Sequence, residues 1–80
     1  MTRYYFHIHD SHGLIPDEEG IELPDRESAV MEARITARDF AASELKAGRP
    51  VDGRTILVKD EDGLDTYELP VRDTIKDIGN

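Results

Sequence analysis

The chain of 80 residues contains no cysteine. Disulfide bonds, thiolate metal sites and a cysteine nucleophile are therefore excluded. The sequence also has no apolar run long enough to span a membrane, and its first residues are typical of a strand, not of a signal peptide. We therefore expect a cytoplasmic protein that has no membrane partner.

Basic residues are few, because 10 Lys and Arg face 18 Asp and Glu, which gives a formal net charge of −8. Binding to a nucleic acid or to anionic lipid needs a basic surface. The composition therefore argues against a nucleic-acid partner. The net negative charge is explained first by solubility, and second by a basic protein partner.

The length of the chain limits how much surface folding can bury. Eighty residues provide one hydrophobic core, and a chain of this size buries only roughly 60 % of the surface that its unfolded state exposes. Association with a second copy would therefore help stability, and a homodimer is the partner that we expect.

The stretch from Asp25 to Gly48 predicts one long helix. Asp25 can accept from the free backbone N–H groups of the first turn. Gly48 can adopt the left-handed conformation that ends a helix, and Pro50 prevents its continuation. Between these ends there is no glycine or proline, and six alanines favour the helix: Ala29, Ala33, Ala37, Ala41, Ala42 and Ala47.

The apolar residues of this helix fall on two adjoining stripes. The first consists mostly of small side chains that can lie close to a sheet: Ala29, Val30, Ala33, Ala37, Phe40 and Ala41. The second has the spacing of a coiled-coil interface: Met31, Ile35, Arg38, Ala42 and Leu45. The apolar arc is wider than one sheet face needs. It is either one broad core surface, or a core stripe beside a homodimer interface.

Apolar alternation predicts four strands, at residues 3–10, 21–23, 54–60 and 64–71. In the first strand, Tyr4, Phe6 and Ile8 should face the helix, and Tyr5, His7 and His9 should face the other way. Residues 11–20 are expected to form a loop, and Asp60-Glu61-Asp62-Gly63 a hairpin turn.

The order β-β-α-β-β predicts an α+β fold. In this fold one long helix, about residues 25–48, packs on one face of an antiparallel sheet of four strands. Residues 1–72 should form a single domain. Residues 73–80 have few apolar anchors, and we expect a frayed C-terminal tail.

Three histidines are the strongest candidates for chemistry. His7 and His9 are two residues apart on a predicted strand and so face the same way. Together with His12 or Asp10 they could bind Zn²⁺ or Ni²⁺. Their spacing resembles the H-x-H-x-D-H element of metallo-β-lactamase-type hydrolases, but that fold needs further ligands on a longer chain. We therefore favour histidines without a bound metal, and we assign no cofactor.

Several short motifs occur in a recognisable order: Tyr4-Tyr5-Phe6-His7, Ile15-Pro16-Asp17-Glu18-Glu19-Gly20, Glu22-Leu23-Pro24-Asp25 and Ala47-Gly48-Arg49-Pro50. With them, the chain resembles a family of short acidic proteobacterial proteins that is known only as a domain of unknown function. The resemblance spans roughly residues 3–72. It implies a compact single domain with no established activity, substrate or partner.

No set of residues predicts catalysis. Ser28 and Ser43 are predicted to be helical without a nearby histidine, and the acidic run at residues 17–19 is interpreted as a solvated loop. We therefore expect no enzyme, but a protein-binding or regulatory module that acts as a homodimer. One alternative is an antitoxin-like partner of a basic protein, since HicB-type antitoxins have a similar layout. The other is a histidine-based metal-binding protein.

Overall fold

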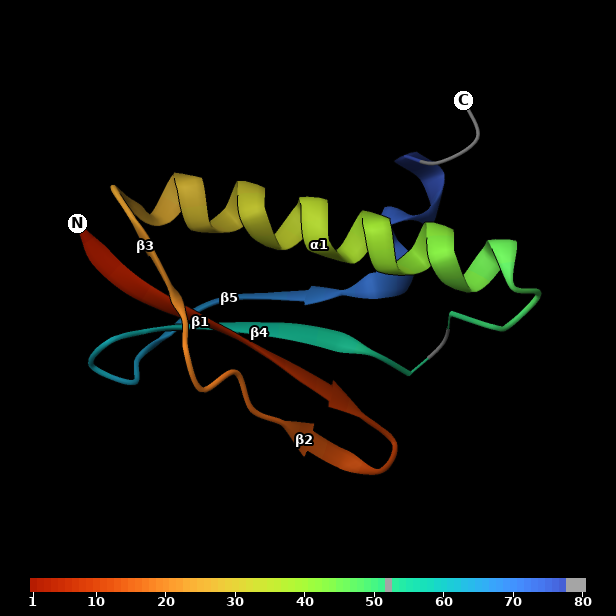
Figure 1. Cartoon of the computed structure of the whole chain (residues 1–80), viewed down its shortest axis with the longest axis horizontal. Helices are drawn as coiled ribbons and strands as arrows, with labels where there is room; N and C mark the ends of the chain where they lie inside the picture. Colours follow the sequence, from red (N-terminus) through yellow and green to blue (C-terminus); the bar gives the residue numbers. More distant parts are fainter. Residues whose placement is uncertain (52, 78–80) are drawn as a thin grey trace.

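The computed structural model describes residues 1–51 and 53–77 and has an α+β fold. One helix packs on a five-stranded antiparallel sheet (Figure 1). The elements are β1 (Thr2–Asp10), β2 (Gly13–Ile15), β3 (Ile21–Leu23), α1 (Arg26–Lys46), β4 (Thr55–Asp60), β5 (Asp65–Pro70) and the 3-10 helix η1 (Val71–Asp77). The predicted fold class is confirmed, with five strands in place of four.

Both ends of α1 follow the sequence signals. The Asp25 Oδ1 atom accepts from the Ser28 N–H at 2.8 Å, which satisfies one free donor of the first turn. Gly48 has a φ of 77°, and its N–H donates to the Leu45 carbonyl at 3.1 Å. A residue with a side chain would be strained in this conformation. The predicted helix from 25 to 48 is confirmed.

The sheet is built around the long strand β1. One edge of β1 pairs with β4 from Tyr4 to His9. Its other edge pairs with β3 at its N-terminal end and with β2 at its C-terminal end. The strand order is β2-β1-β4-β5, so that β2 and β5 lie at the edges.

The strand β2 lies within residues 11–20, which the sequence predicts to be a loop, and this prediction is wrong in part. Asp10 Oδ1 accepts from the His12 N–H at 2.8 Å, and this turn reverses the chain. Gly13–Ile15 then pairs with β1. A strand of three residues is too short to show apolar alternation, which explains why the pattern missed it.

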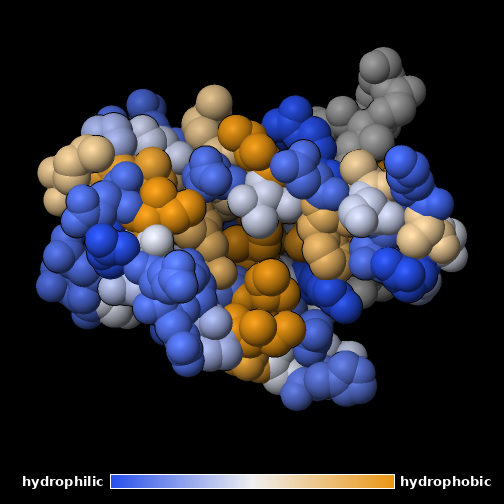
Figure 2. Space-filling view, in the orientation of Figure 1, coloured by the Kyte–Doolittle hydropathy of each residue, from blue (hydrophilic) through white to orange (hydrophobic). Residues whose placement is uncertain are grey.

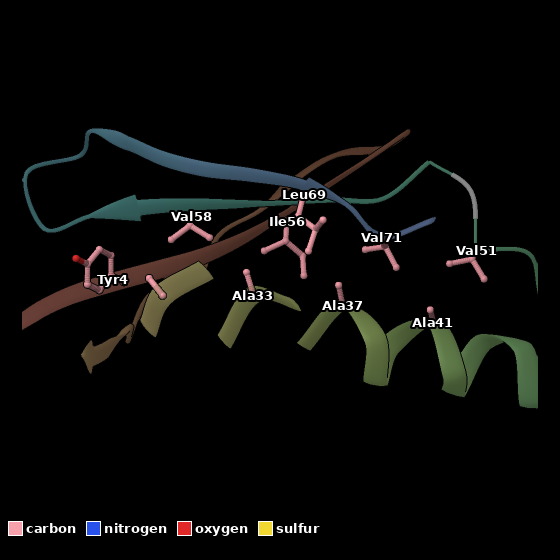
Figure 3. Packing of buried hydrophobic residues seen from close by; sticks show 10 residues of the cluster. Tyr4, Ala33, Ala37, Ala41, Val51, Ile56, Val58, Leu69 and Val71 are labelled. Carbon is pink, nitrogen blue, oxygen red and sulfur yellow. The ribbon is translucent and has the colours of Figure 1, made fainter. Parts of the chain in front are cut away.

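The core lies between α1 and the sheet. Ala29, Ala33, Ala37 and Ala41 are 0 % exposed, so the first stripe of the helix faces the sheet as predicted. Figure 3 shows Ala33, Ala37 and Ala41 opposite buried side chains of the strands and of η1: Tyr4, Ile56, Val58, Leu69 and Val71. Small side chains allow the helix to approach the sheet closely, while the sheet supplies most of the volume.

The C-terminal segment differs from the expected frayed tail. Residues 71–77 form η1, which packs against α1. Thr74 is buried, and its hydroxyl donates to the Val71 carbonyl at 2.7 Å. The hydrogen bond lies within the same turn, so the Thr74 hydroxyl is buried without losing a hydrogen-bond partner. Residues 78–80 of the expected tail lie outside the described residues.

We predict that Ala33→Leu lowers the free energy of unfolding by about 1–3 kcal/mol, because no space is left for a larger side chain between α1 and the sheet. Chemical denaturation followed by circular dichroism measures this change. The control is Ser43→Leu, which adds the same side chain at an exposed position of α1 and should change stability by less than about 0.5 kcal/mol. Equal losses in both variants would contradict close packing at Ala33.

Candidate functional site

The second stripe of the helix lies on the outer face of α1. Met31 is 62 % exposed, Ile35 44 % and Leu45 46 %, and Arg38 and Ala42 are exposed too. The interpretation as one broad core surface is therefore wrong, because these side chains point away from the sheet. In Figure 2, apolar side chains interrupt the charged surface along the helix, at the top of the view. We call these five residues the outer stripe.

A second exposed apolar area lies on β2 and β3, at an edge of the sheet. Leu14, Ile15 and Ile21 are between two fifths and just over half exposed. Figure 2 shows apolar side chains in this region, below the helix. A partly enclosed cavity between α1 and the sheet, lined by Ile8 and Phe40 among others, has a volume of about 30 Å³. That volume corresponds to roughly one water molecule, so the cavity offers no room for a ligand.

Strands β2 and β3 together form one interrupted edge strand beside β1. The pairing of Ile8 with Ile15, continued along the chain, places Phe6 opposite residue 17. The pairing of Tyr4 with Ile21, continued from the other end, places Phe6 opposite residue 19. The two registers differ by two residues, so the chain bulges out of this edge between β2 and β3.

The Asp17 carboxylate completes the hydrogen bonding at this bulge. Its Oδ2 atom accepts from the Phe6 N–H at 3.1 Å, and its Oδ1 atom accepts from the Glu19 and Gly20 N–H groups, both at 3.2 Å. Gly20 has a φ of 69°, and a Cβ atom there would lie 2.8 Å from the Tyr4 carbonyl oxygen. Only glycine allows the chain to pass so close to β1.

Two opposing effects act on the pKa of Asp17. Partial burial raises the pKa, but the hydrogen bonds from the Phe6, Gly20 and Glu19 N–H groups and the attraction of His7 outweigh it. The net result is a pKa below the ordinary value of 3.8. Asp17 is therefore not the solvated loop carboxylate that the sequence pattern indicates. The signal that was available is the Asp-x-x-Gly spacing, which is typical of a turn closed by an aspartate side chain.

His7 contacts the same bulge. Its Nδ1 atom accepts from the Asp17 N–H at 3.0 Å, and its ring lies nearly parallel to that of Tyr5, with 6.3 Å between the ring centroids. The Nδ1 lone pair is thus already in use, and only Nε2 is left to bind a metal.

The other two histidines do not complete a metal site with His7. His9 is exposed on β1, and His12 lies in the turn before β2. Within residues 1–51 and 53–77, no three His, Asp or Glu side chains are placed to hold one metal ion. The weak metal candidates His7, His9 and His12 are therefore not brought together.

The opposite edge of the sheet, β5, is also protected. The Arg26 Nε–H donates to the Thr66 carbonyl at 3.1 Å, and the guanidinium carbon lies 6.0 Å from the centroid of the Tyr67 ring. The strand ends at Pro70, which has no N–H to donate. Bulges, prolines and charged side chains are features that limit pairing between exposed edges.

The match to known families covers most of the chain. A family model described as a domain of unknown function, DUF6894, matches residues 3–72. The chain belongs to this family. No curated protein and no solved structure matches it. In the part of this DUF6894 chain that the structure describes, no helix is both long and apolar enough to cross a membrane.

The matched region of the DUF6894 chain contains α1 and the five strands, apart from Thr2 at the start of β1. Two of the motifs that carry the resemblance, residues 4–7 and 15–20, are distant in sequence but meet at the bulge, where Asp17 bonds to Phe6 and His7. These motifs therefore have a structural role: they hold the broken edge strand on β1.

We predict that Asp17→Asn lowers the free energy of unfolding by about 1–3 kcal/mol near neutral pH, because an amide cannot accept from all three N–H groups. The folded-state pKa of Asp17 lies below the unfolded value. The contribution of the carboxylate is therefore fully present above the unfolded pKa and is lost as the pH falls through the folded pKa.

Urea denaturation of both proteins, near pH 7 and again at about pH 2, measures this pH dependence. The difference between wild type and variant should shrink in acid. Glu18→Gln, at the exposed neighbouring position, serves as the control and should have little effect. A difference that stays constant with pH would show that the Asp17 charge is not responsible.

Proposed function

We propose that this protein is a non-enzymatic protein-binding or regulatory module that acts as a homodimer through the outer stripe of α1. The observation that supports the proposal most strongly is the exposure of Met31, Ile35 and Leu45 on one helix. Burying a large apolar side chain contributes roughly 1.5–3 kcal/mol. Met31, Ile35 and Leu45 are 44–62 % exposed, so each would contribute about half of this on association, and the three together provide a driving force for it.

The dimensions of α1 suit this role. A helix of 21 residues is about 31 Å long at roughly 1.5 Å per residue, and the longest extent of the molecule is 37 Å. A standard interface buries about 800 Å² on each partner. The total accessible surface is 5354 Å², so an interface of this size would cover about 15 % of it.

The sheet edges favour the helix as the interface. The β2–β3 edge is interrupted by the bulge at residues 16–20, and Arg26 occupies a backbone carbonyl of β5. Association through either edge would have to displace these contacts. Association through the outer stripe displaces only water.

Arg38 lies within the otherwise apolar stripe and gives it selectivity. Its aliphatic stem can pack against a neighbour while the guanidinium reaches the rim of the interface. An unpaired cation is costly to bury. The stripe therefore accepts only those partners, and those alignments of two helices, that leave the guanidinium in water or near a carboxylate. The half-buried carboxylate of Asp17, a group of the kind that catalysis uses, is occupied by backbone donors, which favours a binding role over an enzymatic one.

We predict that Ile35→Glu converts a dimer into a folded monomer, because a carboxylate at the centre of the outer stripe would lose its hydration on association. Light scattering after size exclusion should give about 18 kDa for the wild type, twice the 9.0 kDa of one chain, and about 9 kDa for the variant. Circular dichroism should show equal helix content.

The matched control is Ser43→Glu, which places the same charge at an exposed position of α1 outside the stripe and should remain dimeric. A wild type that is monomeric at about 0.1 mM, well above the dissociation constants of stable dimers, would overturn the proposal. Dissociation of both variants to the same extent would show that charge alone, and not the stripe, governs association.

A further inference from the structure

Three arginines gather at one end of this acidic protein. Two adjoining depressions open there and share Gly53 and Arg54 in their linings. The first, about 270 Å³ in volume, lies between the β1–β2 turn and the C-terminal end of α1 and includes Arg49. The second, about 230 Å³, lies where β4 begins and β5 ends and includes Arg72.

The second depression has a lining suited to anions. Of residues 1–51 and 53–77, those that line it are Gly53, Arg54, Thr55, Pro70 and Arg72, and they offer two guanidinium groups and a hydroxyl but no carboxylate. The Val71 N–H donates to the Arg54 carbonyl at 2.9 Å, which fixes the segments that carry the two arginines side by side.

The two arginines differ from others of the chain in their partners. Arg49 pairs with Glu44 at 2.8 Å, and Arg3 with Glu22 at 3.5 Å. Within residues 1–51 and 53–77, by contrast, neither Arg54 nor Arg72 forms an ion pair with a carboxylate.

The guanidinium of Arg54 is held in place by an aromatic ring. Its central carbon lies 4.6 Å from the centroid of the Phe40 ring. Stacking of this kind uses the face of the guanidinium and leaves its N–H edges free to donate. The orientation of Arg54 is thus fixed before any ligand arrives, which reduces the entropy lost on binding.

We propose that Arg54 and Arg72, with the Thr55 hydroxyl, bind a small oxyanion that carries a phosphate or carboxylate group. A guanidinium donates two parallel hydrogen bonds to either group. The volume of about 230 Å³ is below the roughly 300–1,000 Å³ typical of sites for larger ligands, so it suits one such group and not a nucleotide. The site is separate from the outer stripe, and its test does not depend on the oligomeric state.

The test is a titration of the ¹⁵N-labelled protein, followed by NMR, with inorganic phosphate in one arm and citrate in the other. Binding should shift the amide signals of Gly53, Arg54, Thr55 and Arg72 along saturable curves, at constant ionic strength set with NaCl. Saturation by phosphate alone identifies a phosphate ligand. Saturation by citrate alone identifies a carboxylate ligand.

Arg72→Glu should weaken the binding at least tenfold, because it removes a guanidinium that donates to the anion and places a negative charge beside it. Arg72 is exposed, so the substitution should leave the fold intact. Lys46→Glu makes the same charge change near the end of α1, outside the lining, and is the control. Shifts that do not saturate with either anion, or equal weakening by both variants, would overturn the proposal.

Discussion

The close contact between the alanine face of α1 and the sheet determines much of what the rest of the molecule can do. Because Ala33, Ala37 and their neighbours fill the contact with methyl groups, the larger apolar residues that face them come from the strands and η1. The large side chains Met31, Ile35 and Leu45 have no place in this layer and lie on the opposite face of the helix. One choice of residues thus builds the core and leaves an apolar outer surface.

Both edges of the sheet carry features that disfavour pairing with a second chain. The bulge between β2 and β3 interrupts a strand that would otherwise offer backbone groups to a second chain, and Asp17 satisfies the donors that the bulge leaves open. Arg26 has a comparable effect at β5. In the proposed account, a molecule whose edges are occupied and whose helix is apolar on both faces associates through the helix. The proposed anion site, at the end of the sheet, lies apart from this helix surface.

The sequence predicts the regular elements well and the irregular ones poorly. The helix has caps, alanines and a periodic stripe, and its limits are correct within two residues. The bulge depends on Asp17 meeting Phe6, a contact between residues eleven positions apart that no local pattern encodes. The arginine-lined depression likewise joins the start of β4 to the end of β5. The sequence pattern does not predict the burial of Thr74. Its hydroxyl donates to the Val71 carbonyl within η1, and this turn forms only when the segment packs against α1.

Association through the outer stripe is tested most directly by an isotope-filtered NOE measurement. A mixture of labelled and unlabelled protein should show NOEs between chains that involve the methyl groups of Met31 and Ile35. A dimeric sample without such NOEs, or with NOEs that arise instead from Leu14 and Ile15 at the β2 edge, would contradict association through the outer stripe.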